Sequence, residues 1–214
     1  MENFINEIFT AVLNGDAGEA KQKVQAALDD GISPENLLNE GLIAAMKEVG
    51  RLFEEGEYFV PEMLVSARAM QFGMSVLRPV LVEQDIKPVG KVVIGTVKGD
   101  LHDIGKNLVG MMLEGSGFQI IDLGTDVTPE KFLEAIKTHQ PDIVGMSALL
   151  TTTMTNMGII LRYLEENDAR DRVKVIIGGA PITQKYANEI GADGFAPDAS
   201  QAAVIAKRLM GVPQ

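Results

Sequence analysis

The sequence predicts an N-terminal four-helix bundle over residues 1–87, followed by a doubly wound, five-stranded parallel sheet over residues 88–214. Three observations support this fold class. Apolar residues in the first half recur at the spacing of three and four that is typical of helices. In the second half, short apolar runs alternate with helix-length segments, as in parallel sheets that are covered on both faces. Between the halves, the stretch KPVG at residues 87–90 has the composition of a linker.

Four helices are expected in the first half. They cover about 4–13, 17–28, 33–55 and 61–86. The third has the clearest start signal, because Ser33 can act as the N-cap, Pro34 suits the first helical turn and Glu35 adds an acid there. The connections between the helices are short, which favours an antiparallel bundle.

Five strand–helix units are expected in the second half. The strands cover about 92–97, 118–123, 143–146, 173–177 and 194–196, and the helices about 103–115, 129–138, 154–167, 183–190 and 199–210. This alternation is typical of a flavodoxin-like or Rossmann-like doubly wound sheet. With the strand order 2-1-3-4-5, a ligand crevice is expected at the carboxyl ends of the first and third strands.

The composition excludes several classes of protein. A net charge of −11 opposes binding to nucleic acid or to an anionic membrane surface. The absence of cysteine excludes disulfides, thiolate metal sites and a cysteine nucleophile, and it fits a reducing cytoplasm. No apolar run approaches the length of a membrane span. The N-terminus, MENFINEIF, is acidic and amphipathic and has no features of a signal peptide, so we expect a cytoplasmic protein.

The stretch GDLHDIGKN at residues 99–107 follows the first predicted strand and opens a helix. It resembles a Walker phosphate loop only at its end, because Asp100 stands where the first glycine belongs and Asn107 where the closing hydroxyl belongs. Asp100 and Asp103 would also repel phosphate. The G-x-G-x-x-G spacing of a dinucleotide site is absent as well. Nucleotide phosphate binding is therefore disfavoured.

The same stretch offers a candidate metal ligand. A neutral His102 at the carboxyl end of a strand can coordinate a transition metal, and Asp100 can accept the other ring N–H. Gly99 and Gly105 allow a tight turn or the close approach of a large, flat ligand. The alternative is a solvated helix start, and Asp103 has the properties of a cap or first-turn acid.

One histidine cannot hold a bare metal ion. The other histidine, His139, is expected at the opposite edge of the sheet, on the surface. A metal with a single protein ligand implies that a cofactor fills the remaining positions, and a tetrapyrrole-like ring would do so.

Three motifs together resemble the D-x-H-x-x-G … S-x-L … G-G signature of cobalamin-binding domains: GDLHDIGKN, MSAL at 146–149 and IIGGAP at 176–181. The segment VGRLFEEGEYFVPEMLVSARAM at 49–70 resembles the capping bundle of cobalamin-dependent methionine synthase. The catalytic modules of that enzyme have no counterpart here. Nearly the whole chain is similar to the free-standing corrinoid proteins of methyl-transfer systems.

The resemblance implies a cobalamin or related corrinoid that is bound base-off, with His102 as the lower axial ligand of cobalt. Asp100 would accept from the other ring nitrogen, and Thr153 would extend this relay where methionine synthase has a serine. Further cofactor contacts are implied for Gly99, Leu101, Asp103, Ile104, Gly105, Ser147, Leu149, Thr151, Gly178, Gly179 and Ala199. In the bundle, the implied contacts with the upper face are Phe59, Val60 and either Met63 or Leu64.

The resemblance also implies a function, that of a methyl carrier without catalytic activity of its own. Its partners would be a substrate-specific corrinoid methyltransferase, a second methyltransferase that delivers to tetrahydrofolate or a thiol, and a reductive activase. The methyl donor stays open among methanol, methylamine, betaine and methoxylated aromatics. The alternatives are a cobalamin-dependent sensor or regulatory module, an isomerase subunit that uses adenosylcobalamin, and a flavin-binding domain. The aromatic content of 5% and His102 argue against the flavin.

Overall fold

The computed structural model describes residues 2–212; residues 1, 213 and 214, which the predicted domains include, lie outside the described residues. Contacts between Cα atoms divide the chain into two compact units. One unit runs to Pro88 and includes 115–117, and the other begins at Val89, whereas the predicted boundary lay between residues 87 and 88. Within residues 2–212, no helix combines the length and the apolar character needed to cross a membrane.

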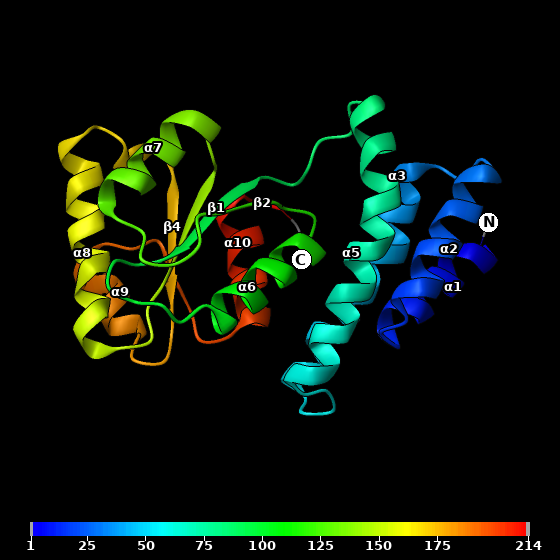
Figure 1. Ribbon diagram of the computed structural model, residues 1–214, viewed down its shortest axis with the longest axis horizontal. Coiled ribbons are helices and arrows are strands. Elements are labelled where there is room, and N and C mark those ends of the chain that lie inside the picture. The colour runs from blue at the N-terminus through cyan, green and yellow to red at the C-terminus, as the bar shows by residue number, and fades with distance from the viewer. Residues whose placement is uncertain (1, 213–214) are drawn as a thin grey trace. The chain divides into compact units, whose positions relative to one another are not determined.

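The first unit is helical. It contains α1 (Glu2–Leu13), α2 (Ala17–Asp29), α3 (Pro34–Asn36), the π-helical segment η1 (Leu37–Ile43), α4 (Ala44–Glu54) and α5 (Val60–Glu83) (Figure 1). Because α3, η1 and α4 follow one another without a break, they form one continuous helical segment, and the predicted four-helix architecture is confirmed. The segment η1 was not predicted from the sequence, and its backbone hydrogen bonds span five residues instead of four.

Helix α5 begins in the segment that was singled out for its apolar residues. The Glu62 carboxylate accepts a hydrogen bond from the Phe59 N–H at 3.0 Å, which satisfies a backbone donor that the helix itself leaves free. Pro61 occupies the first turn, where its missing N–H costs nothing. These two features place the start of α5 at Val60, and they leave the Phe59 side chain 62% exposed.

The core of the helical unit is aliphatic and rich in methionine. Its largest fully buried side chains are Ile8, Leu37, Leu42, Met46, Met63, Met70 and Leu77. Met63 has no exposed surface, whereas its neighbour Leu64 is 37% exposed. Either residue was predicted to contact the ligand. Met63 packs into the bundle core instead, because it shares a helix face with the buried Met70, and Leu64 is the one that presents surface.

The second unit is a parallel sheet with helices on both faces. Its elements are β1 (Lys91–Thr96), α6 (Ile104–Gly115), β2 (Gln119–Asp122), α7 (Pro129–His139), β3 (Ile143–Ser147), α8 (Thr151–Glu166), η2 (Arg170–Arg172), β4 (Lys174–Gly178), α9 (Gln184–Ile190), β5 (Gly194–Ala196) and α10 (Ala199–Leu209). The strand order β2-β1-β3-β4-β5 agrees with the predicted 2-1-3-4-5, and all pairs are parallel. Helix α8 begins at Thr151, about three residues earlier than predicted.

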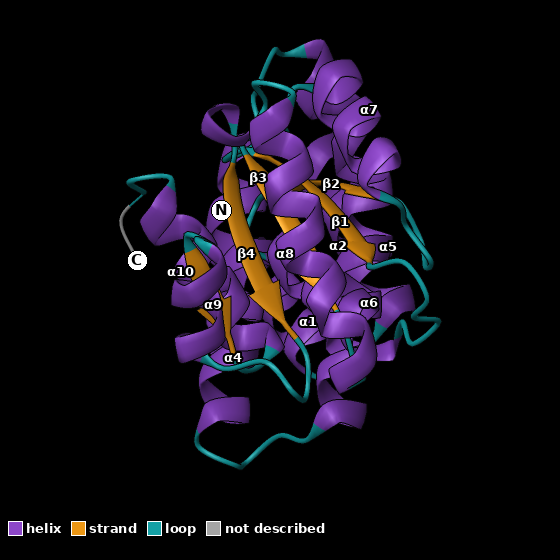
Figure 2. Ribbon diagram, turned by 90° about the vertical axis from the view of Figure 1, so that its left-hand side faces the viewer, coloured by secondary structure: helices purple, strands orange, loops and turns teal. Residues whose placement is uncertain are grey.

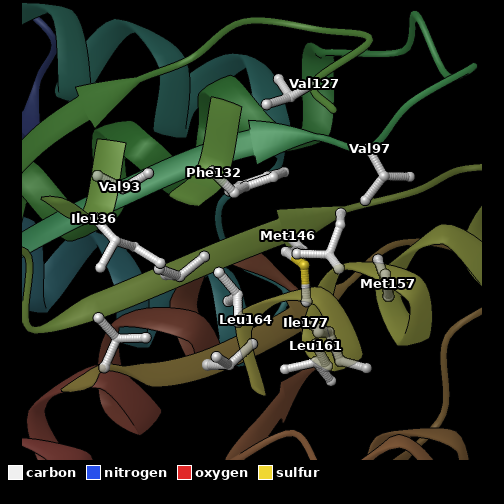
Figure 3. Packing of buried hydrophobic residues seen from close by; sticks show 14 of the residues in the cluster. Val93, Val97, Val127, Phe132, Ile136, Met146, Met157, Leu161, Leu164 and Ile177 are labelled. Carbon is white, nitrogen blue, oxygen red and sulfur yellow. The ribbon is translucent and has the colours of Figure 1, made fainter. Parts of the chain in front are cut away.

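Alternate residues of each strand face opposite layers. Val93 of β1 packs with Phe132 of α7 and Leu161 of α8 in the larger core cluster, part of which Figure 3 shows. Val92 points to the other face and belongs to a cluster with Leu113 of α6 and residues of α10. Figure 2 views the sheet from the side of α7, α8 and α9. Because both faces are covered, ligands are expected at the carboxyl ends of the strands.

Candidate functional site

The candidate site lies where the strand order reverses. Strands β1 and β3 are neighbours, and their carboxyl ends continue into the loops 97–103 and 148–150. The chain leaves β1 toward β2 on one side and leaves β3 toward β4 on the other, and this is the point where doubly wound sheets bind their ligands. The first of these loops carries Asp100 and His102, and the second leads into Thr153 on α8.

Asp100 joins the two loops. Its side chain is fully buried and accepts four hydrogen bonds. Oδ1 contacts the Nδ1 of His102 at 2.8 Å and accepts from the His102 backbone N–H at 3.1 Å. Oδ2 accepts from the Leu149 N–H at 2.8 Å and from the Thr153 hydroxyl at 2.6 Å. Both oxygens therefore have two partners, and the carboxylate is held by residues that follow both strands.

These contacts determine the charge of Asp100. Burial by itself would raise the pKa of the carboxyl group. The hydrogen bonds from Thr153, Leu149 and His102 outweigh burial and hold the pKa of Asp100 well below its usual range. The group is therefore an anion at neutral pH.

An ionised Asp100 fixes the tautomer of His102. The nitrogen that faces a carboxylate at 2.8 Å must carry the proton, so Nδ1 is the donor. In the neutral ring, Nε2 then keeps its lone pair. The side chain of His102 is 53% exposed, so this free nitrogen is accessible. The arrangement is that of a metal-binding imidazole with its supporting carboxylate.

Apolar side chains flank His102 on the chain. Leu101 is 73% exposed and Ile104 is 77% exposed, which is unusual for large aliphatic residues beside a buried carboxylate. A Cβ at Gly105, in the first turn of α6, would meet nothing within 4 Å apart from its chain neighbours and the backbone of its own helix. The protein's own packing thus does not require this glycine, although a helical glycine costs about 0.5–1 kcal/mol relative to alanine. Open space beside an exposed imidazole and apolar residues fits a large, flat ligand.

The other predicted residues of this unit lie at the same edge of the sheet. Ser147 ends β3, Gly178 ends β4, Thr151 begins α8 and Ala199 begins α10 directly after β5. Gly179 has a φ of +126°, and a side chain there would come within 1.9 Å of the Ala148 carbonyl oxygen. The packing of the strand ends is thus a sufficient reason for glycine at this position.

Two further predicted positions have contacts of their own. Asp103 accepts from the side chain of Asn107 at 3.2 Å, which fits the predicted role of a first-turn acid. The second histidine, His139, is exposed at the end of α7, and its carbonyl accepts from Lys91 at the start of β1. It therefore lies at the opposite edge of the sheet, as predicted.

Three supporting residues escaped the sequence analysis. The hydroxyl of Thr96, which is fully buried, donates to the His102 carbonyl at 2.9 Å. The Asn156 side chain donates to the Lys98 carbonyl at 2.8 Å, and Asp126 contacts Gly99 and Asp100. Thr96 had a usable signal, since it is the one hydroxyl residue in the apolar run 92–97. The other two had none, because they contact this loop from 26 or more positions away.

The chain by itself supplies too few ligands for a bare ion. Among residues 2–212, no group of three or more His, Cys, Asp or Glu side chains is placed to hold a metal. His102 offers a single accessible nitrogen. The residues present therefore fit a metal whose other coordination positions belong to a macrocyclic cofactor.

Comparisons with known proteins agree with this fit. Residues 90–204 match the family described as B12 binding domain, and residues 4–78 match a second family with the same description. A corrinoid protein from Desulfitobacterium hafniense is 39% identical over 212 residues, which are 98% of each chain. Trimethylamine corrinoid protein 1 from Methanosarcina acetivorans is 42% identical over 201 residues, which are 93% of each chain.

Solved structures extend the likeness to three dimensions. A chain of the methanol:cobalamin methyltransferase complex MtaBC from Methanosarcina barkeri superimposes with a TM-score of 0.87 at 30% identity, covering 100% of this chain and 81% of that one. The monomethylamine corrinoid protein of Methanosarcina barkeri gives a TM-score of 0.54 at 36% identity, covering 97% and 99%.

Proposed function

We propose that this chain, which belongs to the B12-binding corrinoid proteins, is a methyl carrier in which His102 would hold the cobalt of the cofactor. The observation that carries the proposal is the pair of Asp100 and His102, with a protonated Nδ1 and an accessible Nε2. When bound, the corrinoid supplies a cobalt centre that can take up and release a methyl group. The chain's own residues bind this group and set its ligand.

The buried part of the site controls the basicity of the ligand. Asp100 keeps the proton on Nδ1 and orients the ring, which makes Nε2 a stronger donor toward a metal. The Thr153 hydroxyl has one proton and two acceptors in reach, Asp100 Oδ2 at 2.6 Å and the Leu150 carbonyl at 3.0 Å. The shorter contact is with an anion, so the proton is directed to Asp100. In this proposal Asp100 and Thr153 adjust the reactivity of the bound cobalt through His102.

The names of the relatives support one class of partner for this chain, a substrate-specific methyltransferase. Those names specify dimethylamine and trimethylamine, and one similar structure is a complex with a methanol:cobalamin methyltransferase. We propose that this chain likewise serves a substrate-specific corrinoid methyltransferase. A second methyltransferase, to tetrahydrofolate or a thiol, would remove the methyl group, and a reductive activase would restore the reduced cobalt. We place this chain in the cytoplasm, with which its lack of cysteine agrees.

Purified protein that is reconstituted with hydroxocobalamin and reduced tests the carrier function. We expect the absorption spectrum of the reduced cobalt to be replaced by that of methylcobalamin when a suitable donor methyltransferase and its substrate are added. Enzymes specific for methanol, methylamines, betaine and methoxylated aromatics are tested one at a time. Methylation by at least one of them supports a carrier. Failure with all of them, although the cofactor is bound and reduced, would contradict it and favour a sensor.

The exposed apolar residues at the start of α5 support a protective role for the helical unit. Phe59 is 62% exposed, Val60 40% and Leu64 37%. We propose that these side chains contact the upper face of the bound corrinoid and keep water and oxygen away from it. The double variant Phe59→Ser/Leu64→Ser should lose methylcobalamin by photolysis, and reduced cobalt by oxidation, several-fold faster.

The matched control is Val82→Ser, which removes a side chain that is 73% exposed at the other end of α5. It should behave like the unaltered protein. If the double variant decays no faster than this control, the start of α5 does not cover the cofactor.

A further inference from the structure

Asp126 has an unusual backbone conformation for its place in the fold. Among residues 2–212, the non-glycine residues with positive φ are Asp85, Asp126, Gln140 and Asp168. Asp85, Gln140 and Asp168 follow helices, where the left-handed conformation commonly ends a helix. Asp126, with a φ of +54°, instead lies in the loop between β2 and α7. This conformation is unfavourable for residues with a side chain, so surrounding contacts have to maintain it.

The contacts of Asp126 hold the segment that precedes His102. Its Oδ1 accepts from the Gly99 N–H at 2.7 Å, and its own N–H donates to the Asp100 carbonyl at 3.0 Å. Asp126 thus binds both the N–H group at the start of the Gly99–Asp100 dipeptide and the carbonyl group at its end. Gly99 itself has a φ of +80°, so the segment is bent where it is held.

Asp126 is also firmly attached to the sheet. The Val127 N–H donates to the Thr96 carbonyl at 2.9 Å, and the Thr96 N–H donates to the Gly124 carbonyl at 3.0 Å. Val127 is fully buried in the larger core cluster. The loop that carries Asp126 is therefore an extension of the sheet at the end of β1. It provides a rigid anchor for the segment that precedes His102.

We infer that Asp126 is a positioning residue for His102. This inference rests on the proposed ligation of cobalt by His102. The carboxylate of Asp126 fixes the start of the segment, the Thr96 hydroxyl fixes the His102 carbonyl, and Asp100 fixes the imidazole ring. Loss of the Asp126 carboxylate removes the hydrogen bond to the Gly99 N–H and frees the start of the segment. The segment then samples more conformations. As a result, the imidazole of His102 competes less well with the cofactor's own base for the cobalt.

Three variants separate the effect of the Asp126 carboxylate from the effect of the backbone conformation at this position. Asp126→Gly removes the carboxylate and suits a φ of +54°, so it is expected to fold. Asp126→Asn keeps an oxygen that can accept from Gly99. Asp168→Gly is the matched control, because Asp168 has the same φ of +54° and is exposed after α8, away from the site.

The first measurement uses the protein without cofactor. Amide hydrogen exchange of a peptide that covers 98–103 should be about tenfold faster in Asp126→Gly, and near the wild-type rate in Asp126→Asn and Asp168→Gly. The second uses hydroxocobalamin as the probe. Its dissociation constant should rise about tenfold in Asp126→Gly, as for the loss of a group that supports a metal ligand. The cobalt(II) form should show a smaller fraction with splitting from a protein nitrogen.

The outcomes distinguish a failure of the positioning role of Asp126 from a failure of the proposed ligation of cobalt by His102. Unchanged exchange and unchanged nitrogen splitting in Asp126→Gly would overturn the positioning role. Equal damage in Asp126→Asn and Asp126→Gly would also overturn it, because an acceptor oxygen would then not restore the contact. If the unaltered protein shows no splitting from a protein nitrogen, the proposed ligation by His102 fails. The exchange data would still decide whether Asp126 holds the segment.

Discussion

Replacement of His102 by alanine is expected to abolish ligation of cobalt by the protein. His102 has the one accessible imidazole at this edge of the sheet within residues 2–212, and its Nε2 is free because Asp100 holds the proton on Nδ1. Loss of a group that merely supports a ligand costs about 10–100-fold in metal affinity. Loss of the ligand itself should cost on the order of 100-fold or more in cobalamin affinity. Electron paramagnetic resonance of the cobalt(II) form should lose the splitting from a protein nitrogen.

The second histidine of the chain provides the control. His139 is exposed at the end of α7, at the opposite edge of the sheet, so His139→Ala should leave affinity and spectrum unchanged. The stability of the cofactor-free protein should hardly change in His102→Ala, since this side chain is 53% exposed. A protein nitrogen that still splits the cobalt signal in His102→Ala would refute the assignment of the ligand.

The fold was predictable because each element has a local signal. The apolar runs of β1, β3 and β4 contain mostly residues that are buried between the two helical layers, and such runs mark parallel strands without knowledge of the neighbours. The run of β2, at the edge of the sheet, is only partly buried. The strand order followed from general rules for doubly wound sheets. The π-helical segment at 37–43 was not predictable, because seven residues are too few for the apolar spacing to distinguish a π-helix from an α-helix.

The site was predictable to the extent that its partners are close in sequence or belong to a shared motif. Asp100 and His102 are two residues apart, so the chemistry of one suggests the other. Thr153 came from the resemblance to methionine synthase, and its hydrogen bond to Asp100 spans 53 positions. Asp126 had neither signal. Its contact with Gly99 depends on the β2–α7 loop returning to the end of β1, which only the folded chain specifies.

Replacement of Asp100 by asparagine should change both the ligand and the stability of the fold. Asparagine has a single acceptor oxygen, whereas Asp100 accepts on both oxygens. If the oxygen faces Thr153 and Leu149, the amide NH₂ faces His102 and donates to Nδ1. The ring proton then moves to Nε2, the nitrogen that the metal requires. We expect cobalamin affinity about 10–100-fold lower. The His102 backbone N–H also loses its buried acceptor, so the free energy of unfolding should fall by roughly 1–3 kcal/mol.

The pH dependence of unfolding identifies the charge of Asp100 as the cause. In the folded protein, hydrogen bonds outweigh burial and hold the pKa of this carboxyl group below its usual range. The stabilisation that this shift provides is therefore fully present above the ordinary aspartate pKa, about 3.9, and it is lost as the pH falls through the lower folded value. Urea unfolding of the cofactor-free protein should show a constant gap between wild type and Asp100→Asn from pH 7 to 5, and a narrowing gap below about pH 4.

Asp103→Asn serves as the control for this measurement, since Asp103 is only half-buried and its side chain accepts one hydrogen bond, from Asn107 at 3.2 Å. It should lower the free energy of unfolding by less than about 0.5 kcal/mol. A gap for Asp100→Asn that stays constant down to pH 3 would mean that the stabilisation does not depend on the charge of the carboxylate. An ionised Asp100 would then no longer explain why the proton of His102 lies on Nδ1 and why Nε2 is free. This would hold even if cobalamin still bound.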